Sequence, residues 1–235
     1  IVFGDWSSDV CSSDLGTANG VVKSAKALLS EHPTLEVPVV DGLIRRGETM
    51  NLIAPPKVGK SWLAHHLALC VATGTPWLGF PVFQGDVLLI DNELHPSVLA
   101  YRLSKVAEEL QLPESWAEHV HTWTLRGRLQ SLQSIAGEKL HGHSGGAYRL
   151  IILDALYRFV PSDRSENDNS MMANLYNAID KIAQSSKAAI AVVHHSNRGD
   201  QSGKVITDVG AGAGAQSRAA DAHIILRPHE EDGAY

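Results

Sequence analysis

The chain has 235 residues, of which 44% are hydrophobic and 20% are charged, and its formal net charge is -6. This composition is ordinary for a globular protein with a sizeable core, and it excludes a disordered chain. The acidic balance excludes a surface that is basic throughout, so any contact with nucleic acid must be local.

Two further classes are excluded by what the sequence lacks. No apolar run approaches the roughly 20 residues of a membrane helix, and the N-terminus lacks the basic start and apolar centre of a signal peptide. We therefore predict a cytoplasmic protein with no membrane partner. The cysteines Cys11 and Cys70 cannot form a disulfide framework, and Cys70 falls on a predicted buried helix face, where a lone thiol usually serves packing.

The N-terminal segment differs in character from the rest. Residues 5–15, "DWSSDVCSSDL", have no hydrophobic periodicity and match the translation of a common sequencing-library adapter. We predict that residues 1–15 are an adapter artefact, disordered and without function. Residues 16–37 form a lead-in with an amphipathic helix over 21–32, ended by Pro33. One domain follows over 38–235, and its abrupt end suggests truncation at the C-terminus.

Apolar runs alternate with helical stretches along this domain. Strands are predicted at 49–54, 86–91, 148–154, 188–195 and 222–227, and helices at 60–73, 96–110, 169–185 and 211–220. The runs are apolar on both faces, as strands of a covered parallel sheet are. Strand and helix in repetition predict an α/β fold, a mostly parallel twisted sheet with helices on both faces.

A phosphate-binding loop is predicted where the first strand meets the first helix of the domain. The stretch "APPKVGKS" fits the pattern G-x-x-x-x-G-K-[ST] except that Ala54 replaces its first glycine. Alanine accepts the negative φ expected there, and the prolines precede the amides that face the phosphates. The predicted nucleotide-binding residues are Ala54, Pro55, Pro56, Lys57, Val58, Gly59, Lys60, Ser61 and Trp62.

Acidic residues end two other strands. Asp154 closes the run "RLIILD", where a carboxylate together with Ser61 would hold Mg²⁺ in a P-loop enzyme. Glu93 follows the run "VLLID" and is the candidate that positions the attacking water, with Lys60 contacting the outer phosphates. The alternative for Asp91 and Glu93 is capping of the next helix.

Two histidines end a further strand. His194 and His195 point to opposite faces of the sheet, so one of them should face the nucleotide and sense its terminal phosphate. The sequence leaves open which one does so.

These motifs, in this order, resemble the RepA-type hexameric helicases of the RecA-like P-loop ATPases. The likeness rests on Ala54 to Ser61, "LLIDNEL", "LIILDALYRF", "VVHHSN" and "DVGAGAGAQSRAADAHIILR". It implies a RecA-like ATPase domain over 38–235 with ATP and Mg²⁺ as cofactors. It also implies a catalytic glutamate at Glu93 and a sensor in the histidine pair.

The same resemblance implies partners. Subunits would form a ring, a hexamer in the family, in which an arginine reaches the neighbour's ATP. Arg218 and Arg227 are both candidates, and Arg218 could instead pair with Asp221. Single-stranded DNA would contact loops 161–170 and 196–208, the second of which carries Arg198 and Lys204.

The leading hypothesis is thus an ATPase that drives DNA unwinding or translocation in replication. The alternatives are a P-loop ATPase with a regulatory protein partner and a P-loop small-molecule kinase. The kinase hypothesis requires an arginine-rich lid, and the sequence shows no such cluster.

Overall fold

The structure is a computed structural model that describes residues 22–128, 130–137, 148–160, 168–196 and 218–227. The chain divides into two compact units, Ile1–Leu35 and Glu36–Tyr235. The segment predicted to be an adapter artefact lies outside the described residues.

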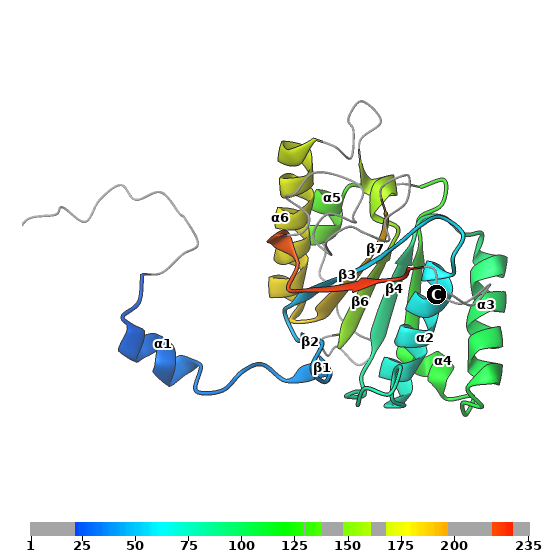
Figure 1. Ribbon diagram of the computed structural model, residues 1–235, viewed down its shortest axis with the longest axis horizontal. Helices are drawn as coiled ribbons and strands as arrows, with labels where there is room; N and C mark the ends of the chain where they lie inside the picture. The colour runs from blue at the N-terminus through cyan, green and yellow to red at the C-terminus, as the bar shows by residue number, and fades with distance from the viewer. Residues whose placement is uncertain (1–21, 129, 138–147, 161–167, 197–217, 228–235) are drawn as a thin grey trace, which may run out of the picture. The chain divides into compact units, whose positions relative to one another are not determined.

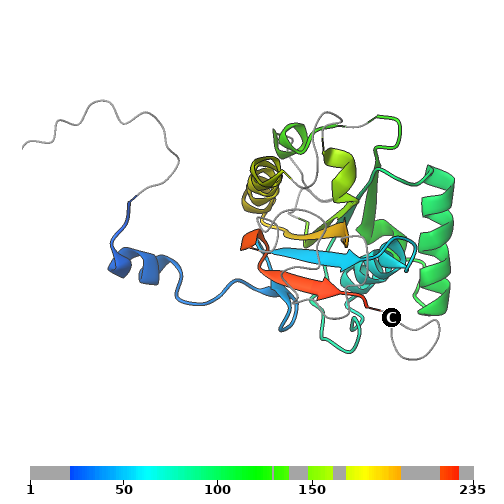
Figure 2. The same ribbon diagram turned by 45° about the horizontal axis from the view of Figure 1, so that its top comes forward.

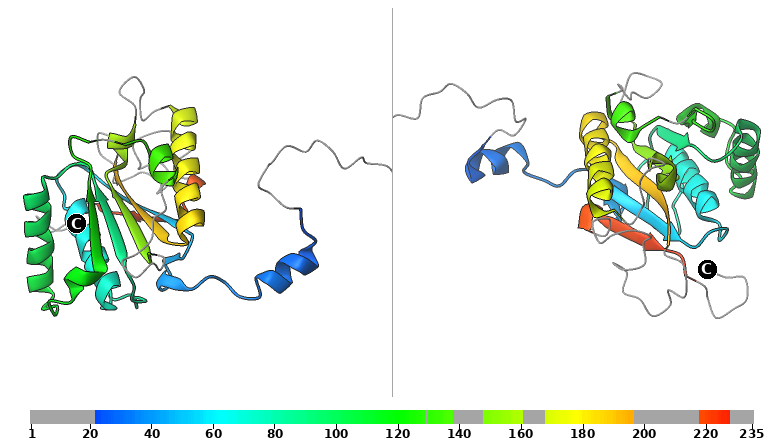
Figure 3. Two further views of the ribbon diagram at one scale, coloured as in Figure 1. Left: turned by 180° about the vertical axis from the view of Figure 1, so that it is seen from behind. Right: turned by 90° about the horizontal axis from the view of Figure 1, so that it is seen from above.

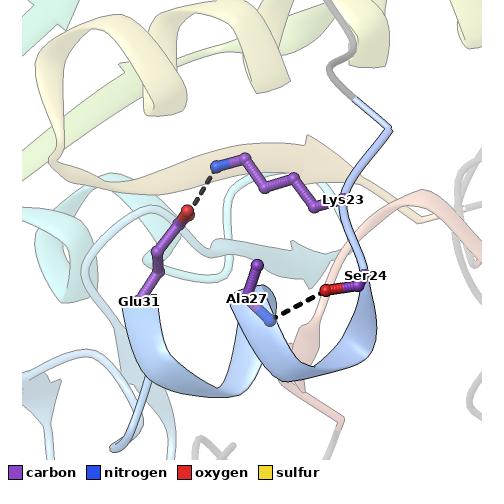
Figure 4. Close-up of polar contacts among 4 residues, drawn as sticks. All are labelled: Lys23, Ser24, Ala27 and Glu31. Atoms are coloured by element: carbon purple, nitrogen blue, oxygen red, sulfur yellow. Dashed lines mark hydrogen bonds and ion pairs between the residues drawn. The ribbon is translucent and has the colours of Figure 1, made fainter.

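The first unit contains one short helix, α1 (Ala25–Glu31). The Ser24 hydroxyl caps its N-terminus by accepting a hydrogen bond from the Ala27 N–H at 3.2 Å, which satisfies one of the backbone donors that a helix start leaves unpaired. An ion pair between Lys23 and Glu31 spans the helix (Figure 4). The helix is shorter than the predicted span of 21–32.

The second unit is built on one sheet of six strands, all of them parallel (Figure 1). The spatial order is β5 (Val120–Thr124), β4 (Val87–Asp91), β6 (Leu150–Asp154), β7 (Ala189–His195), β3 (Thr49–Ala54) and β8 (Ala222–Ile225). All residues of β3, β4 and β6 are buried. These strands are Val-, Ile- and Leu-rich because both of their faces are covered.

Helices cover both faces of this sheet (Figures 2 and 3). On one face, α2 (Lys60–Thr73) and α3 (Pro96–Glu109) pack in a core with alternate strand residues such as Leu52, Leu89 and Ile152. On the other, α5 (Leu132–Gly137) and α6 (Asn169–Ser186) pack against the intervening strand residues, with the 3₁₀ helix η1 (Leu156–Phe159). The fold is the α/β architecture that the sequence predicts.

One buried polar pair joins the sheet to α6. The Tyr176 hydroxyl donates a hydrogen bond of 2.8 Å to Oδ1 of Asn51, which is fully buried on β3. Asn51 also lies 3.4 Å from a ring nitrogen of His223 on β8. Buried polar groups are nearly always hydrogen-bonded because leaving one unpaired costs free energy, so this pair fixes how α6 sits on the sheet.

The predicted elements agree with the structure closely at the centre of the sheet and less well at its edges. Strand β3 and helix α2 have the predicted bounds, and the other predicted strands are one or two residues shorter in the structure. Strand β5 was not predicted, because Val120 and Trp123 are its only apolar residues and stand three positions apart, and only Val120 is buried. Most of the predicted helix over 211–220 lies outside the described residues.

Five smaller elements were also missed, and two of them are α5 and η1. The strands β1 (Pro38–Val40) and β2 (Ile44–Arg45) form an antiparallel pair before β3, and α4 (Trp116–His119) precedes β5. Gly47 lies in the turn before β3, where it has φ of 80° and donates a hydrogen bond to the Ala188 carbonyl. Such short elements carry too few residues for a periodic pattern.

Candidate nucleotide-binding site

The predicted phosphate loop connects the end of β3 to the start of α2. Ala54 is the last residue of β3 and pairs in register with His195 of β7, so its extended backbone fits the negative φ expected for alanine at this position. Gly59 has φ of 97° and caps the N-terminus of α2. A Cβ built on Gly59 meets no atom of the chain within 4 Å. Glycine is therefore favoured here by the left-handed backbone conformation, and not by a lack of space for a side chain.

The loop therefore presents the N-terminus of a helix of 14 residues to the carboxyl edge of the sheet. The first N–H groups of a helix have no intrahelical acceptor, and the helix dipole makes this end attractive to anions. Pro55 and Pro56 precede these donors in the loop, so the missing proline N–H groups remove none of them. The geometry is that of an anion-binding loop.

Lys60 reaches back over this loop from the first position of α2. Its ammonium donates hydrogen bonds to the carbonyls of Ala54 at 3.0 Å and Pro55 at 2.6 Å, and only 7% of the residue is exposed. Burial lowers the pKa of Lys60, while the carboxylates of Asp154 and Glu93 act in the opposite direction. The lysine is thus a buried cation held beside two acidic strand ends.

A cleft of about 360 Å³ opens at this point. It is lined by residues from the loop, α2, α3 and the ends of three strands: Lys57, Gly59, Lys60, Ser61, Trp62, Glu93, Leu94, Arg102, Asp154, Ala155, Val193 and His195. Five of the nine predicted nucleotide-binding residues are therefore in the lining. Ala54, Pro55, Pro56 and Val58 are not, since they form the chain that leads into the cleft.

The acidic strand ends meet because β4 and β6 are neighbours. Asp91 pairs in register with Asp154, and Asn92 then fastens the two ends together. The Asn92 side chain donates to the Ala155 carbonyl at 3.1 Å and accepts from the Ala155 N–H at 2.9 Å, while its own N–H donates to the Asp154 carbonyl at 2.9 Å. These three bonds fix the backbone that carries Asp154.

Asp154 is 1% exposed, and neither carboxylate oxygen has a hydrogen bond of good geometry. Burial raises the pKa of Asp154 to about 7, outweighing the nearby Ser61 hydroxyl, which lowers it. A hydroxyl and a carboxylate oxygen are ligands that Mg²⁺ prefers, and oxygens left unpaired inside a protein are those an ion can use. Ser61 and Asp154 therefore fit the predicted magnesium site.

Glu93 lines the cleft from the loop that connects β4 to α3. Its N–H donates to Oδ1 of Asp91 at 2.9 Å, and the Leu94 N–H donates to the same oxygen at 2.7 Å. Asp91 thus holds the loop that carries Glu93, and it does not cap the next helix, α3, whose N-cap is His95 with no side-chain cap hydrogen bond. The Glu93 carboxylate also raises the pKa of Tyr157 by accepting a hydrogen bond, after the larger effect of burial, so the two side chains are within contact.

The histidine pair divides between the two faces of β7. His195 lines the cleft, and its ring lies 5.2 Å from the ring of Tyr157, centroid to centroid. His194 is 1% exposed and does not line the cleft, and its Nδ1 lies 2.6 Å from the His195 carbonyl. The alternation of strand side chains therefore places His195 on the side of the loop.

The candidate arginines do not reach the cleft. Arg218 is exposed, and Arg227 is partly buried just after β8; neither lines the cleft. Among the described residues no ion pair joins Arg218 to Asp221, whose carboxylate instead accepts a hydrogen bond from the Thr49 N–H at 2.8 Å. Most of the predicted DNA loops, 161–167 and 197–208 with Arg198 and Lys204, lie outside the described residues.

The family model for AAA domains, AAA_25, matches residues 22–201, more than half of the chain. The chain belongs to this family. Its P-loop ATPase type agrees with the parallel sheet and with the loop before α2. Within the described parts of this AAA domain, no helix has both the length and the apolar character that crossing a membrane requires.

Sequence reasoning missed Arg102, which lines the cleft of the AAA domain, and Tyr157, which contacts Glu93 and His195. Arg102 lies on α3 next to Leu99 and Leu103, which are buried, and its guanidinium lies 5.1 Å from the ring centre of Trp62. The helical spacing of Leu99 and Leu103 could have placed Arg102 at the edge of the buried face. Nothing in the local sequence indicates that this edge faces Trp62, since the two lie 40 positions apart.

Proposed function

We propose that this AAA domain binds ATP with Mg²⁺ and hydrolyses it. One observation carries the proposal: Lys60, Ser61, Glu93 and Asp154 come from three separate segments of the chain and line one cleft at the carboxyl edge of the sheet. Ligands of open parallel sheets bind at this edge. The set contains a cation for the outer phosphates, oxygen ligands for a magnesium ion and a carboxylate for the water.

Each of these cleft residues has a distinct role in the proposed reaction. The N–H groups at the start of α2 and the Lys60 ammonium orient the phosphates, and Glu93 orients and polarises the attacking water. Mg²⁺, held by Ser61 and Asp154, supplies charge neutralisation at the phosphates when bound. His195 lies where it can contact the terminal phosphate, while His194 lies on the opposite face of the strand.

The test of hydrolysis is the substitution Glu93→Gln, which keeps the side chain's size and removes its charge. We expect ATP affinity within about threefold of the wild type and a kcat lower by about 10² to 10⁴, the usual contribution of general acid and base groups. Glu109→Gln, an exposed glutamate at the end of α3, is the matched control and should retain full turnover. Wild-type turnover in Glu93→Gln would remove this residue from the reaction.

We further propose that hydrolysis drives unwinding of DNA or translocation along it. The order and content of the motifs support this, because they resemble those of the RepA-type ring helicases. The proposed form is a cytoplasmic ring, a hexamer, in which Arg218 or Arg227 reaches the neighbouring subunit's ATP. An arginine supplied in this way raises hydrolysis by 10³ to 10⁵ in related P-loop enzymes.

Partner identity is tested by measuring ATP turnover with single-stranded DNA, without it, and with small phosphoryl acceptors. We expect single-stranded DNA to stimulate turnover, and stimulation should weaken with rising salt because phosphate contacts release counterions. Unchanged turnover with DNA would favour a regulatory protein partner. Phosphorylation of a small acceptor would favour a kinase.

A further inference from the structure

A second group of polar side chains lies inside the AAA domain, on the same face of the sheet as the cleft. It consists of His65 on α2, Asp91 at the end of β4 and Asp154 at the end of β6, and one ligand atom from each lies within 4.8 Å of the others. His65 and Asp91 are 0% exposed. Neither lines the cleft, so this cluster extends from Asp154 into the interior.

The cluster holds an unusual number of buried polar atoms without partners. Both ring nitrogens of His65, Oδ2 of Asp91 and both carboxylate oxygens of Asp154 lack hydrogen bonds of good geometry. Only Oδ1 of Asp91 accepts hydrogen bonds, from the N–H groups of Glu93 and Leu94. An unpaired buried polar atom costs roughly 1–3 kcal/mol, so these five atoms are candidate ligand atoms for a partner that satisfies several of them together.

The charges of the cluster indicate that its partner is a cation. Two carboxylates lie side by side in the interior, and the nearby ammonium of Lys60 already donates hydrogen bonds to the carbonyls of Ala54 and Pro55. Buried charges normally pair or bind a metal. A divalent cation would balance both carboxylates and use the free imidazole nitrogen.

The donor set selects among metals. Mg²⁺ and Ca²⁺ take oxygen ligands, whereas imidazole with carboxylates suits first-row transition metals such as Co²⁺ and Zn²⁺. Bonds of about 2.0–2.2 Å hold three ligands of one ion about 3–3.8 Å from each other. The three atoms lie within 4.8 Å of one another, so side-chain shifts of up to about 1 Å would close them around an ion.

We propose that His65, Asp91 and Asp154 bind a divalent transition-metal ion inside the domain, in a site that shares only Asp154 with the one proposed for magnesium. Such an ion would join α2, β4 and β6 at the point where the nucleotide cleft begins. An ion would reach the site through the cleft, since Asp154 is common to both. The inference does not depend on ATP hydrolysis.

Cobalt is the probe, because its visible absorption reports the coordination of the ion. The full chain without an affinity tag, stripped with a chelator and free of nucleotide, is titrated with Co²⁺ in excess Mg²⁺ by absorption and calorimetry. The variant His65→Leu removes the imidazole and keeps an apolar side chain in the core. The control is His66→Leu, the adjacent residue on α2, which is only partly buried and outside the cluster.

We expect the wild type and His66→Leu to bind one equivalent of Co²⁺ that Mg²⁺ does not displace, and His65→Leu to bind it at least 10-fold more weakly. Equal binding by His65→Leu, or none by the wild type, would overturn the site. If His65→Leu fails to fold by circular dichroism, His65→Phe takes its place under the same expectation, and retained binding in either variant overturns the site.

Binding of an ATP analogue with Mg²⁺ is measured on the same samples. His65→Leu should keep its nucleotide affinity while losing Co²⁺. Absence of cobalt binding with normal ATP turnover would refute the proposed metal site and leave the proposed ATP hydrolysis standing. Normal cobalt binding without ATP turnover would refute the proposed ATP hydrolysis and leave the metal site standing.

Discussion

The substitution Lys60→Met tests the phosphate loop most directly. Methionine keeps most of the lysine's apolar stem, which is buried, and removes only the ammonium. That ammonium lies at the start of α2 with its hydrogen bonds directed to the loop carbonyls of Ala54 and Pro55. The change therefore separates the charge from the packing of the side chain.

The expected loss of affinity follows from the hydrogen bonds that an ammonium makes to phosphate. A hydrogen bond to a charged group contributes about 1.5–3 kcal/mol, and about 1.4 kcal/mol corresponds to a tenfold change in the dissociation constant. If Lys60 makes one such bond to the outer phosphates, the affinity for ATP should fall about 10- to 150-fold. A second bond would deepen the loss.

The fold should survive the same substitution. Two hydrogen bonds to carbonyls are lost, which destabilises the folded chain. The burial that lowers the pKa of Lys60 is relieved, which stabilises it. We expect these effects to offset one another to within about 1 kcal/mol, a shift in Tm of about 2–4 °C for a domain of this size.

The assay is titration with a fluorescent ATP analogue in the presence of Mg²⁺, together with thermal unfolding followed by circular dichroism. Lys181→Met, an exposed lysine on α6 across the sheet, is the control for loss of one positive charge. Unchanged affinity in a folded Lys60→Met protein would refute the assignment of this loop to phosphates.

Two further predictions concern stability. Tyr176→Phe should lower the free energy of unfolding by about 1–3 kcal/mol, because Oδ1 of buried Asn51 loses its hydrogen bond; denaturation in urea measures this, and an unchanged midpoint would mean that water replaces the hydroxyl. Burial lowers the pKa of His65 and His194 to about 4, so each histidine stabilises the folded chain above pH 6.5 and loses that contribution as pH falls toward 4. Asp154, with its pKa raised to about 7, acts in the opposite direction over the same range. In chelator, His65→Leu should lose less stability than the wild type as the pH falls from 6.5 toward 4, and an equal loss would contradict the burial of a neutral His65.

The sequence by itself determined the centre of the fold and the phosphate loop. Apolar runs such as "TMNLIA" and "LIILD" predict buried parallel strands because every side chain in them avoids water. The sequence of the loop predicts its role because Gly59 allows the left-handed backbone conformation and Lys60 supplies the positive charge. Both residues lie within the same short motif. These are local requirements, and a local pattern records them.

Only the tertiary structure decided which distant residues meet. The edge strand β5 was missed because most of its residues are only partly buried, so its sequence has neither an apolar run nor a regular alternation. The choice between His194 and His195 depends on which face of β7 lies toward α2, and this follows from the packing of the helices rather than from the pair itself.

The same reason explains Asn92 and His65. Asn92 fastens β4 to β6, and His65 lies beside Asp91 and Asp154, because strand order places β4 next to β6 beneath α2. Hydrogen bonds and metal ligands act over a few ångströms. Contacts between segments far apart in the chain, such as Asn92 and Ala155 at a separation of 63 residues, therefore exist only once the sheet has assembled.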